Sequence, residues 1–201
     1  RECIDLNDHQ AMRRVLNPVD VLPSVQPEDA AMIQYTSGTT GFPKGAVLSH
    51  LSLLNNARFY ADRLGVSRNS VWINIMPMFH TSGCGMVTLG CLQAGCKMLI
   101  VKLFEPPAVC RVIEREKVST ILGVPTMLVA ILEALDKEPC DVSSVEMFSS
   151  GGAVVAPELV RNIKRVFGCG FGTLYGQTET SPVITQHFPD DSIEDICHTI
   201  G

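Results

Sequence analysis

The residues best suited to chemistry in this sequence form a dense run of glycines and hydroxyls between positions 35 and 45, Tyr-Thr-Ser-Gly-Thr-Thr-Gly-Phe-Pro-Lys-Gly. Glycines let the backbone turn and expose successive N–H groups to an anion, and the hydroxyls add further donors. Lys44 supplies a positive charge on a long side chain. A Walker A loop requires Ser or Thr after the lysine, whereas Gly45 follows Lys44. The run therefore predicts a phosphate site of another kind, made by Thr36, Ser37, Gly38, Thr39, Thr40, Gly41 and Lys44.

A second chemical segment, Tyr175-Gly176-Gln177-Thr178-Glu179, follows an apolar run that reads as a strand. An aromatic face suits a nucleobase, a hydroxyl suits a phosphate, and a carboxylate is a hard ligand for Mg²⁺ beside phosphate oxygens. Taken alone, the segment is equally typical of a strand end with a polar turn. Beside the first run, it predicts a nucleotide site.

Two further segments carry weaker signals. Ser150-Gly151-Gly152-Ala153 has two glycines that permit close approach of a ligand to the backbone, although such a turn is also ordinary between a strand and a helix. His80 lies in the segment Pro-Met-Phe-His-Thr-Ser-Gly. A lone histidine after an aromatic residue is more often a hydrogen-bonded structural residue, but its occurrence beside the other segments favours a functional role. We do not assign it as a general base. Met76, Met78 and Met86 could line an acyl tunnel, but filling core gaps is the commoner use of methionine.

Together these segments resemble the conserved motifs of the adenylate-forming superfamily, which includes acyl- and aryl-CoA synthetases, adenylation domains of peptide synthetases, and luciferases. The nearest general likeness is to bacterial medium- or long-chain fatty acyl-CoA synthetases. The resemblance implies that Tyr175 stacks on adenine, Thr178 binds near the α-phosphate, and Glu179 holds Mg²⁺. It implies ATP contacts from Gly152, Ala153, Gly176 and Gln177 as well, catalytic roles for Lys44, Thr178 and Glu179, and an acyl-site or gating role for His80 and Gly151.

The chemistry that the resemblance implies has two steps. A carboxylate attacks the α-phosphorus of ATP and expels pyrophosphate, and the coenzyme A thiol then attacks the acyl-AMP and expels AMP. ATP, Mg²⁺ and coenzyme A are the expected cofactors and co-substrates, and a fatty or other apolar acid is the favoured substrate. An amino-acid adenylation domain is an alternative that would need an acidic residue for the amine. A nucleotide-binding module without turnover is the alternative from another class.

The elements that must position these residues alternate between strands and helices. Apolar stretches predict strands over 31–35, 46–48, 71–75, 97–101, 119–122, 146–149 and 171–175. Helices are expected over 49–64 and 83–93, and from 106, 125 and 157 onward, where prolines suit a first turn. This alternation indicates an α/β fold, a layered and mainly parallel sheet with flanking helices. Trp72 is expected in the core and His187 at the surface, and no element is assigned after 175.

Composition limits the kinds of partner. The formal net charge is −5 and no basic stripe is present, so nucleic acid is a poor candidate partner. No apolar run approaches the ~20 residues that a transmembrane helix needs, and no signal peptide is visible. The 8 cysteines form no Cys-x-x-Cys pair and fit buried thiols in a reducing, cytoplasmic setting. Charged residues make up only 18% of the chain. Such a low fraction is expected if part of the surface is covered by other protein, for example in a homo-oligomer, but it is equally expected of a merely apolar domain.

The domain expectation is an irregular lead-in over 1–30 and a partial AMP-binding (adenylation) domain over 31–201. No segment resembling the superfamily's ribose-binding Gly-Asp motif, hinge residue or C-terminal catalytic lysine follows Glu179, and no Lys or Arg occurs after it. The 201-residue chain by itself is therefore expected to be inactive, whereas a longer parent protein is expected to be an AMP-forming acid–thiol ligase.

Overall fold

The structure is a computed structural model and describes residues 23–38 and 41–201. The lead-in expected over 1–30 therefore lies mostly outside the described residues, and Thr39 and Thr40 lie outside them as well.

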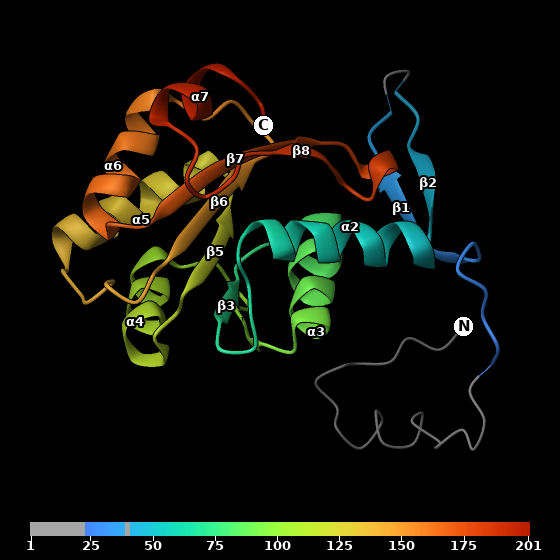
Figure 1. The fold of residues 1–201 in the computed structure, drawn as a ribbon, viewed down its shortest axis with the longest axis horizontal. Helices are drawn as coiled ribbons and strands as arrows, with labels where there is room; N and C mark the ends of the chain where they lie inside the picture. The colour runs from blue at the N-terminus through green and yellow to red at the C-terminus, as the bar shows by residue number, and fades with distance from the viewer. Residues whose placement is uncertain (1–22, 39–40) are drawn as a thin grey trace.

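A six-stranded sheet forms the centre of the molecule (Figure 1). The first five strands pair in parallel with their neighbours, and only the last, β8, pairs antiparallel with β7. The expectation of a layered, mainly parallel α/β sheet is confirmed. In spatial order the strands are β4 (Lys97–Ile100), β3 (Val71–Asn74), β5 (Thr120–Gly123), β6 (Met147–Gly151), β7 (Gly170–Gly176) and β8 (Val183–Gln186).

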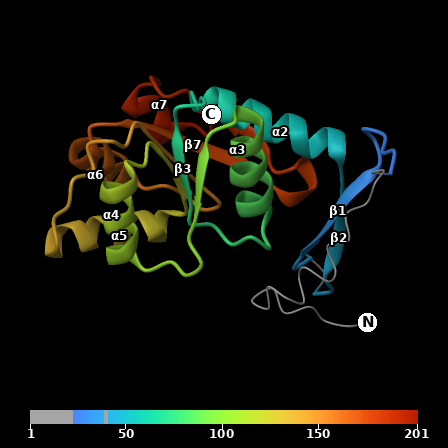
Figure 2. The same cartoon turned by 90° about the horizontal axis from the view of Figure 1, so that it is seen from below.

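Helices cover both faces of this sheet. Successive side chains of a strand point to opposite sides, and the strands carry apolar side chains on both faces that the helices bury. Ile73 of β3 and Phe148 of β6 pack into the core on one face, whereas Trp72 and Met147 pack into the core on the other. The first face is covered by α4 (Pro106–Glu116), α5 (Pro125–Lys137), α6 (Pro157–Phe167) and α7 (Ile193–His198). The second is covered by α2 (His50–Arg63), a π-helix over Ser82–Leu89, and α3 (Gly90–Ala94) (Figures 1 and 2).

Local sequence explains where these helices begin. Ser49 caps α2, because its side chain accepts a hydrogen bond of 3.2 Å from Ser52 N. Helices α4, α5 and α6 each carry proline in the first turn, where no N–H is needed. The expected helix starts are therefore confirmed.

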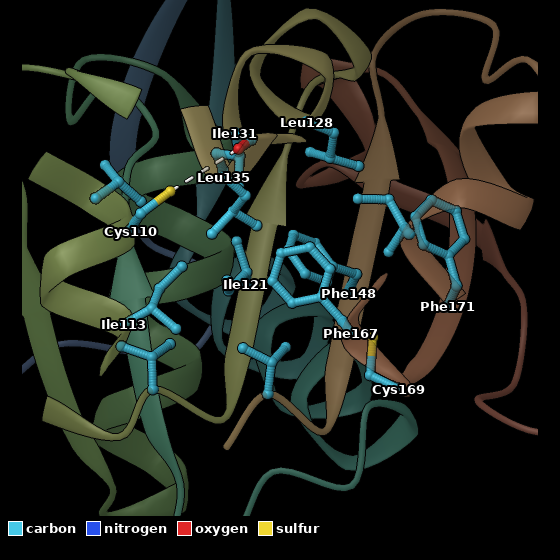
Figure 3. Packing of buried hydrophobic residues seen from close by; sticks show 14 of the residues in the cluster. Cys110, Ile113, Ile121, Leu128, Ile131, Leu135, Phe148, Phe167, Cys169 and Phe171 are labelled. Atoms are coloured by element: carbon cyan, nitrogen blue, oxygen red, sulfur yellow. Dashed lines mark hydrogen bonds between the residues drawn. The ribbon is translucent and has the colours of Figure 1, made fainter. Parts of the chain in front are cut away.

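Aromatic and aliphatic side chains fill the larger core (Figure 3). Phe148 and Phe167 meet edge to face, with ring centroids 4.7 Å apart. Full burial of each such side chain stabilises the fold by roughly 1.5–3 kcal/mol. Trp72 is completely buried, as expected. The sheet is thus a rigid platform for the loops at its edges.

A separate antiparallel hairpin stands beside the sheet (Figure 2) and consists of β1 (Ala30–Thr36) and β2 (Lys44–Ser49). The expected strands are confirmed, but each is longer than expected. Thr36 ends β1 and Lys44 opens β2, so the described residues of the phosphate run lie at these two strand ends and between them.

Four features differ from the sequence expectations. The segment expected as a helix over 83–93 begins as a π-helix, and β8 and α7 were not expected. Strand β8 has only four residues, and α7 depends on a local cap in which Ser192 accepts from Asp195 N at 3.0 Å. The surface expectation for His187 is wrong. Its ring is buried between the hydroxyls of Thr173, at 2.8 Å, and Thr199, at 2.7 Å.

Seven cysteines fall in the described residues, and each is a free thiol. Burial raises the pKa of the Cys110 thiol to about 12 and that of Cys169 to about 11. Within residues 23–38 and 41–201, no helix combines the length and apolar character that crossing a bilayer would require.

Candidate active site

A cavity of about 490 Å³ opens at the carboxyl edge of the sheet. Its lining comes from residues at or just after the ends of four parallel strands: Met76 and Pro77 after β3, Gly123 and Val124 after β5, Gly151 and Gly152 after β6, and Gly176, Gln177 and Thr178 after β7. Crevices outside the carboxyl ends of parallel strands are where open α/β sheets bind ligands.

Apolar side chains make most of the cavity wall, including Met76, Phe79, Met86, Leu122 and Met127. Among the described residues that line it there is no Asp, Glu, Lys or Arg. Met76 and Met86 thus face the cavity, whereas Met78 does not belong to its lining. The wall suits an uncharged, apolar group.

His80 lines this cavity and is exposed to solvent. Ser82 N donates to His80 Nδ1 at 3.1 Å, and the Ser82 hydroxyl lies 2.9 Å from the same atom. A backbone N–H can only donate, so Nδ1 accepts and the neutral ring carries its proton on Nε2. The loop therefore presents Nε2–H as the free polar group of His80.

The Tyr175 segment leaves β7 and forms a short 3₁₀ turn over Thr178–Thr180. The Thr180 hydroxyl lies 2.8 Å from both Gln177 O and Pro182 O, which closes the turn. A side chain on Gly176 would collide with the carbonyl of Pro182, so this close approach requires glycine. The turn presents an exposed Glu179 to solvent.

The predicted phosphate run lies at the tip of the β1–β2 hairpin. Gly38 and Gly41 have φ values of +67° and +86°, which favour glycine. The Thr36 hydroxyl lies 3.5 Å from Lys44 O across the hairpin. Lys44 is exposed and takes part in none of the ion pairs found in the described part of the chain.

Direct contacts tie the hairpin to the other segments. Gln34 of β1 donates from Nε2 to Phe79 O at 2.9 Å, and β2 packs against the Thr178–Thr180 turn. The Ser181 hydroxyl lies 2.9 Å from that of Ser52, in the first turn of the helix that follows β2. The phosphate run, the His80 loop and the Tyr175 segment are therefore neighbours.

The structure thus separates the predicted site residues into two groups. His80, Gly151, Gly152, Gly176, Gln177 and Thr178 surround the cavity. Within the described chain, Tyr175, Glu179, Ala153 and the hairpin residues Thr36, Ser37, Gly38, Gly41 and Lys44 lie outside its lining. Sequence reasoning missed Gly123, Val124 and Met127, although their position just after an expected strand was an available signal.

Metal binding can be tested against the donor groups present. No cluster of three His, Cys, Asp or Glu side chains occurs in the described residues. Mg²⁺ usually takes one or two carboxylates and completes its shell with water and substrate phosphates. A single exposed Glu179 near a phosphate run fits that mode of binding.

The mainly parallel sheet with a cavity at its carboxyl edge places the chain in the class of open α/β folds, which bind ligands at this edge. A model of the family described as AMP-binding enzyme matches residues 4–201. The chain belongs to the AMP-binding enzyme family.

Several relatives are similar over most of this chain. YngI of Bacillus subtilis is 36% identical over 89% of the chain and 33% of its own length. The human mitochondrial medium-chain acyl-CoA ligase ACSF2 is 34% identical over 86% of the chain and 29% of its own length. The chain therefore spans about a third of the length of these relatives.

Solved structures of other proteins have a similar fold. ATP-bound MatB from Rhodopseudomonas palustris superposes with a TM-score of 0.74 at 30% identity, over 84% of this chain and 33% of that one. A long-chain-fatty-acid-CoA ligase from Archaeoglobus fulgidus gives a TM-score of 0.75 at 30% identity, over 86% of this chain and 36% of that one. Several of these relatives are named as acyl-CoA synthetases or ligases.

Proposed function

We propose that this chain carries the nucleotide and acyl sites of an AMP-forming acid–thiol ligase that acts on an apolar carboxylic acid. The observation that carries the proposal is the apolar cavity at the carboxyl edge of the sheet, which Thr178 and His80 help to line. ATP-bound MatB and the Archaeoglobus fatty-acid ligase have the same fold and support both the nucleotide and the acid.

In the first proposed step, the acid lies in the cavity with its carboxylate towards Thr178. The Thr178 hydroxyl would steady the α-phosphate while the carboxylate attacks it. Hydroxyls and N–H groups of the hairpin tip, with Lys44, would hold the departing pyrophosphate. Glu179 would hold Mg²⁺, whose charge would offset that of the phosphates. Positioning and charge neutralisation of this kind are the main protein contributions to phosphate-centred displacements.

The remaining roles complete the proposal. Tyr175, 47% exposed at the end of β7, would place its ring against adenine, beside the Gly151–Gly152 turn. Nε2–H of His80 would face the boundary between nucleotide and acid. In the second step the thiol of coenzyme A would displace AMP from the acyl group. A cytoplasmic setting belongs to the same proposal and is supported by the free thiols.

The lack of Asp, Glu, Lys and Arg in the described cavity lining limits which carboxylic acid can be the substrate. An amino acid would bring an ammonium group and a dicarboxylate a second carboxylate, and both need a buried counter-charge. The described lining contains no Asp, Glu, Lys or Arg for that purpose. A saturated or aromatic monocarboxylate is therefore the proposed substrate class.

The test is pyrophosphate release by the longest chain that contains this sequence, with ATP, Mg²⁺ and a panel of carboxylates. The panel comprises short and long saturated acids, an aromatic acid, malonate and several amino acids. Apolar monocarboxylates should give the highest kcat/KM, and addition of coenzyme A should yield the thioester. Preferential turnover of amino acids or malonate would refute the substrate class, and no release with any acid would refute the reaction.

A further inference from the structure

Asn74, the last residue of β3, is 1% exposed yet polar. Its side-chain amide is directed into the segment 76–88. Nδ2 donates to Gly83 O at 3.0 Å and lies 3.4 Å from Thr88 Oγ1 and 3.3 Å from Met78 Sδ. Oδ1 accepts from Met76 N at 3.2 Å. One buried amide therefore links the end of the strand, the His80 loop and both ends of the π-helix.

The segment closes tightly around this amide. The Thr88 hydroxyl donates to the same Gly83 carbonyl at 2.8 Å, so Gly83 O has two side-chain partners. A side chain on Gly83 would collide with the carbonyl of Pro77, which shows how closely the two ends of the loop approach. The loop shape thus depends on Asn74, Thr88 and the absence of a side chain at position 83.

This network acts on the candidate site without belonging to it. Met76, His80, Ser82 and Met86 line the cavity, and each lies on the segment that Asn74 holds. In the described residues Asn74 is not part of the lining. The neighbouring Ile73 and Ile75 are both buried and apolar, so the core alone gives no reason for an amide at this position.

We propose that Asn74 is a positioning residue that sets the acid-facing wall and the orientation of His80, and thereby tunes the affinity for the carboxylic acid. The proposal rests on the proposed function for its acid, and on the hydrogen-bond network for its geometry. Without the Asn74 amide, Met76 N would lose its acceptor and Gly83 O would lose one of its two side-chain donors. A shifted loop would then be favoured, because leaving polar groups unsatisfied away from water is costly.

The test uses Asn74→Leu and Thr88→Val in the longest chain that contains this sequence. Both substitutions keep the branching of the side chain and remove a hydrogen bond to Gly83 O. Ser119→Ala is the matched control. It removes a buried hydroxyl that accepts a hydrogen bond of 3.0 Å from Val71 N. Val71 is the first residue of β3 and Asn74 the last, so this hydrogen bond lies far from the cavity edge.

Two readouts are measured, together with the stability of every variant. In steady-state kinetics, Asn74→Leu should raise KM for the acid by about tenfold and leave KM for ATP within about twofold, since uniform binding of one substrate is lost. Thr88→Val should shift the same parameter less, and the double variant should equal Asn74→Leu, because the two residues belong to one network. In hydrogen exchange, amides of 76–88 should exchange faster in both variants but not in Ser119→Ala.

The outcomes separate this inference from the proposed function. If the unaltered protein activates no carboxylate, the proposed function fails and hydrogen exchange alone decides whether Asn74 holds the loop. If 76–88 exchanges no faster in Asn74→Leu or Thr88→Val than in Ser119→Ala, the positioning role is overturned. It is equally overturned if KM for acid and for ATP rise together in proportion to the loss of stability. Should Asn74→Leu fail to fold, Thr88→Val gives the same two readouts.

Discussion

The side-chain amide of Asn56 pairs with the main chain of Val183 in both directions. Its Nδ2 donates to Val183 O at 2.7 Å, and Val183 N donates to its Oδ1 at 3.1 Å. The same Nδ2 lies 3.3 Å from Thr180 O. A helix residue therefore takes the place of a neighbouring strand for the chain that leaves the Thr178–Thr180 turn. Because α2 directly follows β2, this pair also fixes the turn relative to the phosphate hairpin.

Asn56→Ala should lower the free energy of unfolding by about 1–3 kcal/mol, because it leaves main-chain groups of Val183 without partners. It should also raise KM for ATP in the longest chain that contains this sequence, since the turn that carries Thr178 loses its anchor. Urea unfolding and steady-state kinetics measure the two effects. Asn162→Ala, on α6, is the control and should change stability by less than about 0.5 kcal/mol. Equal effects of the two substitutions would contradict the anchoring role.

Lys44→Ala and Glu179→Gln should each reduce adenylation on the order of 100-fold, because each removes a charge that we propose to act on the phosphates. Pyrophosphate release from the longest chain that contains this sequence, at saturating acid, measures the loss. Lys102→Ala and Glu133→Gln change exposed residues of the same types, on the loop after β4 and on α5, and should leave the rate unchanged. Near-normal release by both site variants would show that the phosphate site lies elsewhere.

Hydrophobic periodicity and turn residues were enough to predict the parallel strands of the sheet and most helices. The buried stretches around Trp72, Ile121 and Phe148 read as strands, and prolines marked the starts of α4, α5 and α6. The short strand β8 escaped prediction because its pairing partner, not its own four residues, makes it a strand. The prediction that His187 lies at the surface was wrong for a similar reason. Only the fold brings Thr173 and Thr199 to its two ring nitrogens.

The candidate site was predictable where its residues form local motifs. Gly151–Gly152, His80 and the Gly176–Thr178 run can each be recognised in a few neighbouring positions. Residues that act across the fold give no such signal. Asn56 lies 127 positions from Val183, and Asn74 makes its contacts from inside an apolar strand. Their roles follow from hydrogen-bond geometry, which no local pattern contains.

Cys169 predicts a loss of stability at alkaline pH. Burial raises its pKa from 9.0 to about 11, so the thiol stays protonated to a higher pH in the folded state than in the unfolded state. Its contribution is fully present below about pH 9 and is lost as the pH rises through the folded pKa. Urea unfolding at about pH 8 and about pH 10.5 should therefore show a larger decrease for the unaltered chain than for Cys169→Ala. Identical decreases would show that this thiol titrates normally.

The hairpin predicts association of the 201-residue chain. Ile33, Tyr35 and Val47 are 60%, 68% and 64% exposed, and Ile33 pairs with Val47 across the two strands. Residues two apart on a strand share a face, so the three side chains form one apolar patch. Patches of this kind mark surfaces that other protein covers, which agrees with the low charged fraction of 18%.

In sedimentation, the mean mass of the chain should therefore rise with concentration. A double substitution, Ile33→Lys with Val47→Lys, should abolish the rise, whereas Leu103→Lys, at an equally exposed position (70%) outside the patch, should not. Association that persists in the double variant would place the contact on another face.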